Sequence, residues 1–88
     1  MAKHYLELIA WQKAMLMVTY VYETTQSFPN DEKFGLVSHI RRSAVSVPSN
    51  IAEGQARNTT GEFIQFLGIA RGSTAELTTQ LLIAANLG

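Results

Sequence analysis

The sequence predicts an all-α protein, an antiparallel up-and-down helical bundle. Apolar residues recur in three blocks at alternating spacings of three and four, and no segment shows the strict alternation that is typical of a β-strand. The connections between the blocks are short, so consecutive helices should run antiparallel. We expect a single domain over residues 1–88, with helices at about 6–27, 31–56 and 60–86.

The first block predicts a helix that is contacted from more than one side. One apolar line runs along it at helical spacing: Leu8, Trp11, Met15, Val18 and Tyr22. A second apolar line on the same segment includes Leu6, Ile9, Leu16 and Tyr20, which leaves only a narrow polar strip. Pro29 should end this helix, because proline disfavours helical geometry in the residue before it. Asn30 is then placed to cap the next helix, with acids in its first turn.

The second block has its apolar face at Val37, Ile40, Ala44, Val47 and Ile51. Pro48 interrupts this pattern and should remove one backbone hydrogen bond and bend the helix. The block ends between Gly54 and Asn58, where glycine and asparagine are typical of a helix stop.

The third block begins with a capping-box pattern, Thr59 followed three residues later by Glu62. Its apolar face then continues through Phe63, Phe66, Ala70, Ser73, Leu77 and Ala84. Gly68 and Gly72 lie in the middle of this helix, where each costs about 1 kcal/mol relative to alanine. We expect them to mark a close approach of another helix.

The composition narrows the class of protein. The 88 residues are 47% hydrophobic and only 16% charged, against roughly 25% charged in an ordinary soluble domain. On folding, a chain of this size buries about 60 to 65% of the surface that the unfolded chain exposes. Much of its apolar surface would therefore stay exposed to water in a compact monomer. Either the chain associates, or part of it is missing. The mean hydropathy is +0.05.

The charges and the cysteine count exclude several function classes. Seven basic residues balance seven acidic ones, which removes the long-range field of a dedicated nucleic-acid or membrane-surface binder but leaves room for a local basic patch. No cysteine is present, so disulfides and thiolate metal sites are excluded.

No segment is typical of export or of a membrane span. The start of the sequence lacks a continuous apolar run. The longest charge-free stretch, residues 77–88, is shorter than the ~20 apolar residues that a spanning helix needs. We expect a cytoplasmic protein without membrane contact.

Catalytic and metal sites are not indicated. His39 lies four residues before Ser43 on one predicted helical face, but no third residue orients the imidazole and no glycine-rich turn holds the serine. A solvated or interface histidine is the simpler interpretation. His4 and His39 stand alone in the sequence, whereas a metal needs three or four convergent ligands. We expect no catalytic residue, no metal, no cofactor and no enzyme activity.

A polar strip follows one side of the second helix, through Arg42, Ser46, Ser49 or Asn50, Glu53 and Arg57. Two interpretations stay open: a solvated face, or a partly buried polar network that defines an interface. The candidate interface or network residues on the second and third helices are Ser46, Ser49, Asn50, Glu53, Gly72, Ser73 and Glu76.

Arginines form a second set of candidates. Arg41, Arg42, Arg57 and Arg71 outnumber the lysines, and the guanidinium group suits bidentate contact with phosphate or carboxylate. These four are the candidate nucleic-acid contacts, and pairing with acids on the same helices is an equal alternative. With so few charges, a single chain should bind nucleic acid weakly, and several chains would have to act together.

Several motifs, in order, resemble those of a known family. They are Trp11-Gln12-x-Ala14, Phe28-Pro29, Ile40-Arg41-Arg42-Ser43-Ala44, Ser46-Val47-Pro48-Ser49-Asn50-Ile51-Ala52-Glu53-Gly54 and Gly72-Ser73-x-x-Glu76-Leu77. The chain resembles the bacterial four-helix bundle family that includes proteins encoded in intervening sequences within 23S ribosomal RNA genes. It is also similar to the accessory subunit of diversity-generating retroelements.

The resemblance implies a four-helix antiparallel bundle that assembles as a homopentamer, with three of the four helices present here and the fourth beyond Leu87-Gly88. It implies RNA or ribonucleoprotein binding in some members and no enzyme activity. Asn50, Glu53 and Gly54 match motif positions, and the resemblance gives the four arginines as basic positions available to face RNA. The predicted function is a non-enzymatic oligomer that contacts RNA or a nucleic-acid enzyme. The alternative is a protein-binding scaffold or self-assembly module without nucleic-acid contact.

Overall fold

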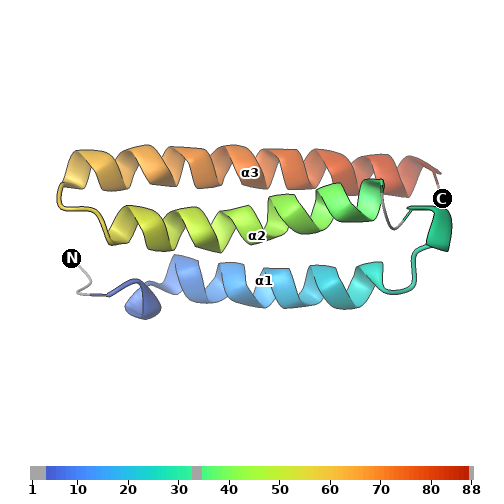
Figure 1. Ribbon diagram of the computed structural model, residues 1–88, viewed down its shortest axis with the longest axis horizontal. Coiled ribbons are helices and arrows are strands. Elements are labelled where there is room, and N and C mark those ends of the chain that lie inside the picture. Colours follow the sequence, from blue (N-terminus) through green and yellow to red (C-terminus); the bar gives the residue numbers. More distant parts are fainter. Residues whose placement is uncertain (1–3, 33–34, 88) are drawn as a thin grey trace.

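The computed structural model describes residues 4–32 and 35–87. These residues form a short 3-10 helix η1 (Tyr5–Glu7), helix α1 (Ile9–Thr25), a second 3-10 helix η2 (Asn30–Glu32), helix α2 (Leu36–Gln55) and helix α3 (Thr60–Leu87). Helix α2 lies between α1 and α3 and runs opposite to both (Figure 1). The described part of the chain contains no strand, so the predicted all-α, up-down-up arrangement is confirmed.

The predicted boundaries of the first two helices are wrong by a few residues. Residues 5–7 form η1, whose first turn is capped by His4, and Leu8 is extended (φ −76°, ψ 124°), so α1 begins only at Ile9. Asn30 does not cap the second helix, because Asn30–Glu32 form the separate turn η2. Helix α2 begins at Leu36, after Gly35. The chain therefore uses a longer connection to reverse its direction than the sequence predicts.

The start of α3 agrees with the capping-box prediction. The backbone N–H of Glu62 donates to Thr59 Oγ1 at 3.1 Å, and the Thr59 hydroxyl donates to Glu62 Oε1 at 3.1 Å. Pro48 is buried inside α2, which continues through it as one helix.

The buried core forms two clusters along α2. Toward the chain's N-terminal end the core contains Ala14, Val47, Ile51 and Ala70. Toward the opposite end it contains Val21, Ile40, Ala44 and Leu77. Each cluster joins residues of all three helices, so α2 buries parts of its surface against α1 and against α3.

One glycine, Gly54, allows α2 and α3 to approach closely, and it is neither of the two that the sequence indicated. A Cβ atom added to buried Gly54 would lie 2.6 Å from Phe66 Cβ and 3.3 Å from the carbonyl oxygen of Phe63. Gly54 is thus a packing residue within α2, and the helix stop predicted near it comes after Gln55.

The expected close packing at Gly68 and Gly72 is wrong for the described chain. A Cβ atom added to either glycine meets no atom within 4 Å, and both residues are exposed. The physical reason is their position on α3: at 100° per residue they lie on the side of that helix away from the buried Ala70 and Leu77.

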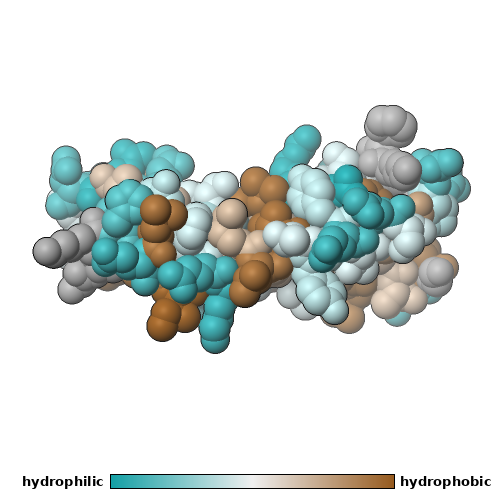
Figure 2. All heavy atoms as spheres, turned by 90° about the horizontal axis from the view of Figure 1, so that it is seen from below, coloured by the Kyte–Doolittle hydropathy of each residue, from teal (hydrophilic) through white to brown (hydrophobic). Residues whose placement is uncertain are grey.

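The molecule is elongated and leaves much apolar surface uncovered. Its principal extents are 43 × 19 × 17 Å. Figure 2 views it from the α1 side, where hydrophobic side chains interrupt the hydrophilic surface. Among the described residues, no helix is long and apolar enough to cross a membrane.

Candidate functional site

A network of hydrogen bonds joins the facing sides of α2 and α3. The hydroxyl groups of Ser46 and Ser73 lie 2.7 Å apart across the interface. The Asn50 side chain donates through Nδ2 to the carbonyl oxygen of Ser46 at 2.8 Å and to its Oγ at 2.9 Å. Three of the candidate network residues therefore lie together, half-buried between the two helices.

Ser43 extends this network along the interface. Its side chain is buried, and its Oγ lies 2.8 Å from Glu76 Oε1 and 3.0 Å from Gln80 Oε1. A serine hydroxyl has a single proton, so it donates to only one of these oxygens. The carboxylate of Glu76 is the stronger acceptor. The Gln80 side chain forms a second hydrogen bond with Ser43 when its amide group is turned by half a rotation, because its nitrogen then donates to Ser43 Oγ.

The remaining candidate network residues lie outside this interface. Glu53 Oε2 accepts a hydrogen bond from Arg57 at 3.0 Å on the same helix, and both side chains are about half exposed. Ser49 is exposed on α2, and Gly72 is exposed on α3. The polar strip predicted from spacing is therefore divided between a buried side and a solvated side.

Two of the four candidate arginines make contacts within the chain. Arg41 donates through Nε to Thr25 Oγ1 at 2.9 Å and through an Nη atom to the Tyr22 carbonyl at 3.3 Å, and its guanidinium carbon lies 4.5 Å from the centre of the Tyr22 ring. This places a cation at the C-terminus of α1, where backbone carbonyls lack helical partners. Arg57 binds Glu53 and lies over the Phe66 ring at 4.8 Å.

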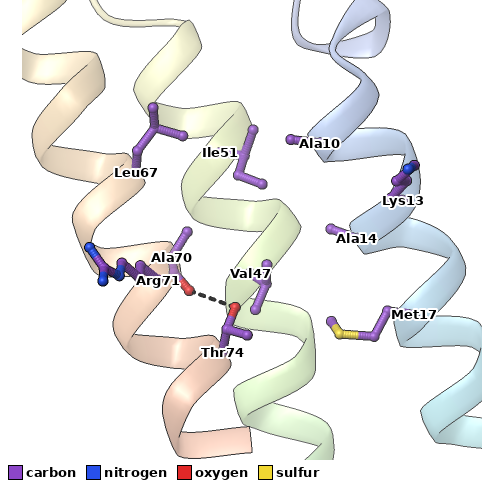
Figure 3. A pocket seen from close by; sticks show the side chains of 10 residues that line it. All are labelled: Ala10, Lys13, Ala14, Met17, Val47, Ile51, Leu67, Ala70, Arg71 and Thr74. Atoms are coloured by element: carbon purple, nitrogen blue, oxygen red, sulfur yellow. Dashed lines mark hydrogen bonds between the residues drawn. The ribbon is translucent and has the colours of Figure 1, made fainter. Parts of the chain in front are cut away.

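The other two arginines are exposed, and neither makes a hydrogen bond or an ion pair with any residue that the structure describes. Arg71 lines an open groove of about 380 Å³ between α1 and α3, above α2 (Figure 3). Lys13 on α1 and Arg71 on α3 border the groove at its two edges, and the Arg71 guanidinium group points away from α2 (Figure 3). The lining residues are Ala10, Lys13, Ala14, Met17, Val47, Ile51, Leu67, Ala70, Arg71 and Thr74.

Arg42 lies at a different hollow. This second hollow, of about 450 Å³, is formed by α1 and α2 and is lined by Tyr22, Val37, Ser38, Arg41, Arg42 and Val45. Arg42 and Arg71 therefore do not converge on one patch of a single chain. Any surface that uses both of them extends over more than one side of the molecule.

Comparison with protein families shows which family the chain belongs to. The family model described as 23S rRNA-intervening sequence protein matches residues 6–88, nearly the whole chain. The chain belongs to this family. A search of curated proteins found no match.

In this member of the 23S rRNA-intervening sequence protein family, His39 and Ser43 are not arranged as a catalytic base and its nucleophile. His39 is exposed, whereas Ser43 is buried and bound to Glu76 and Gln80. Within residues 4–32 and 35–87, no group of three or more His, Asp or Glu side chains is placed to hold a metal ion.

The sequence interpretation missed Ser43, Gln80 and the acceptor Thr25. A signal for the first two was present, because Ser43, Ser46 and Asn50 recur at spacings of three and four on α2, and Ser73, Glu76 and Gln80 recur at the same spacings on α3. Two matching polar stripes on consecutive antiparallel helices predict an interhelical network. No comparable pattern marks Thr25, which contacts a residue on another helix, sixteen positions later in the sequence.

Proposed function

We propose that this member of the 23S rRNA-intervening sequence protein family is a non-enzymatic protein that assembles with copies of itself and contacts RNA through the assembled surface. The observation that supports RNA contact is the pair of exposed guanidinium groups, Arg42 and Arg71, which no described residue neutralises. The family resemblance supports a homopentamer as the assembled form.

Assembly is required because one chain presents few free cations. Its formal net charge is zero, and its two unpaired arginines lie at separate hollows. Contacts to phosphate are short-ranged and each one adds little. A ring of copies repeats Arg42 and Arg71 around one particle, so that a structured RNA meets several of them at once.

A gel-shift titration with a structured RNA at two salt concentrations tests the RNA contact. The assembled protein should bind at low salt and more weakly at high salt. Arg42→Gln and Arg71→Gln should each weaken binding and lower the slope of log affinity against log salt by about 1 for each phosphate left without its arginine. Arg57→Gln is the matched control, because Arg57 is already bound to Glu53. Absence of binding by the assembled wild-type protein at low salt would overturn the proposal.

A protein-binding scaffold without RNA contact is the second candidate function. The observation that favours it is the apolar groove between α1 and α3, in a chain with only 16% charged residues. Retention of a protein partner after nuclease treatment would support this candidate, and release of the partner would count against it.

A further inference from the structure

The second hollow, between α1 and α2, contains a planar cation that is held in place. Arg41 donates through Nε to Thr25 Oγ1 at 2.9 Å and through an Nη atom to the Tyr22 carbonyl oxygen at 3.3 Å. Both acceptors are uncharged, and no carboxylate of the described residues forms an ion pair with this guanidinium group. Its position is therefore fixed before any ligand binds, which lowers the entropy that a ligand must remove.

The same guanidinium group lies over an aromatic ring that also lines the hollow. Its central carbon is 4.5 Å from the centre of the Tyr22 ring, and Tyr22 is 40% exposed. Val37 and Val45 add apolar side chains to the lining. Aromatic rings and guanidinium planes are the surfaces on which proteins stack the bases of RNA. The hollow therefore offers a stacking surface for a flat base.

Two polar side chains on α2 lie beside this stacking surface. Ser38 and Arg42 both line the hollow and both are exposed. They are four residues apart, so they are neighbours on the surface of the helix. A guanidinium group binds phosphate, and a serine hydroxyl both donates and accepts hydrogen bonds. None of the described residues that line the hollow is acidic, so no carboxylate there repels a phosphate.

We infer that the second hollow holds one unpaired nucleotide of the RNA, an inference that rests on the RNA contact proposed above. The base stacks against Arg41 and Tyr22. Arg42 binds the phosphate of that nucleotide, and Ser38 forms a hydrogen bond with the ribose or the base edge. The hollow's volume of about 450 Å³ is within the range of roughly 300–1,000 Å³ that is usual for small-molecule sites.

The stacking surface favours unpaired RNA over a duplex. The bases of a duplex stay stacked on one another, so a duplex presents phosphates and 2′-hydroxyl groups but no free base face. The contact of Arg42 with phosphate is common to both forms of RNA. The contact with Tyr22 and Arg41 is specific to a base that is not paired.

Fluorescence anisotropy with a labelled RNA tests the stacking. The probe is a short strand without self-complementarity, used alone and annealed to its complement, at low salt. Tyr22→Leu removes the ring but keeps the carbonyl group that binds Arg41. It should weaken binding of the single strand by about 10-fold and leave binding of the duplex unchanged. Wild-type affinity of Tyr22→Leu for the single strand would contradict the inference.

Two further variants separate stacking from effects on the fold. Tyr22→Phe retains the aromatic ring and should bind the single strand as the wild type does. Tyr20→Leu is the matched control on the same helix, because Tyr20 is 73% exposed and does not line the hollow. Native mass measurement checks that each variant assembles as the wild type does. If Tyr22→Phe or Tyr20→Leu lost as much affinity as Tyr22→Leu, stacking on this ring would be wrong.

Photo-cross-linking locates the base on the wild-type protein. A single strand that carries 4-thiouridine is irradiated in the complex, and mass spectrometry identifies the modified residues. We expect cross-links at Tyr22 and at the α2 residues that line the hollow. Cross-links confined to the groove beside Arg71 would place the base elsewhere and refute the inference.

Failure of the RNA proposal is distinguishable from failure of this inference. Arg42→Gln should weaken binding of both the single strand and the duplex, because both carry phosphates. If the wild type binds both forms equally and Tyr22→Leu changes neither affinity, the RNA contact stands and the nucleotide site is wrong. If neither form binds to the assembled wild-type protein, the proposed function itself is wrong.

Discussion

The two helix interfaces of this chain are built differently. Between α2 and α3, side chains make directional hydrogen bonds, between Ser46 and Ser73 and from Ser43 to Glu76, and Gly54 brings the backbones together. Between α1 and α2, apolar contacts predominate, and the polar contacts between the described residues of the two helices come from one side chain, Arg41.

This difference has a consequence for the role of each helix. Hydrogen bonds at fixed positions define the register of α3 against α2, because a shift along the axis would break each of them. Apolar contacts tolerate small shifts more readily. Helix α1 also exposes large apolar side chains, Ile9, Leu16 and Tyr20, that no described residue covers.

The largest expected effect comes from truncating one core residue on each side of α2. Leu77→Ala, on α3, should destabilise the fold by about 3 kcal/mol, because it leaves a cavity in the buried cluster. Val21→Ala, on α1, removes less buried hydrocarbon from the same cluster and should cost about 2 kcal/mol. Denaturant unfolding at one protein concentration measures both. If Val21→Ala destabilised the fold more than Leu77→Ala, this expected order of the two sides of α2 would be wrong.

A smaller effect is expected from filling the close contact between α2 and α3. In Gly54→Ala the new Cβ would meet Phe66 Cβ and the Phe63 carbonyl, so the helices must separate. We expect a destabilisation of about 2 kcal/mol, since overpacking outweighs the better helix propensity of alanine. Gly61→Ala is the matched control on α3, because its Cβ meets no atom within 4 Å. Thermal unfolding measures both, and equal stability of the two variants would contradict a tight α2–α3 contact.

The smallest effect is the coupling between Ser46 and Ser73. A double-mutant cycle with Ser46→Ala and Ser73→Ala should give a coupling energy of about 1 kcal/mol, the net contribution of one hydrogen bond. A second cycle that pairs Ser49→Ala with Ser73→Ala serves as the control, because exposed Ser49 lies outside the network. Additive effects in the first cycle would mean that the hydroxyl pair does not stabilise the α2–α3 interface.

The sequence predicted the local features of the fold well. The three helices follow from apolar spacing, and the start of α3 follows from Thr59 and Glu62, which bind each other three residues apart. Asn30 shows the limit of such signals. Its residue type is suited to a helix cap, but η2 forms there, because the reversal between antiparallel helices takes up these residues.

The candidate site was predicted only in part. The spacing placed Ser46, Asn50 and Ser73 among the network candidates, but it also included Ser49 and Glu53, which lie on the solvated side. Likewise, it did not separate Arg41, whose side chain binds the end of α1, from the exposed Arg42 beside it.

The sequence by itself determined that the chain forms three amphipathic helices with polar residues on two of them, because a period of 3.6 residues is a local property of the backbone. Only the tertiary structure decided which residues meet. The rotation of each helix about its axis depends on the packing of its neighbours. That rotation placed Gly54 at a contact and Gly68 on an open face, bound Arg41 and Arg57 within the chain, and left Arg42 and Arg71 free among the described residues.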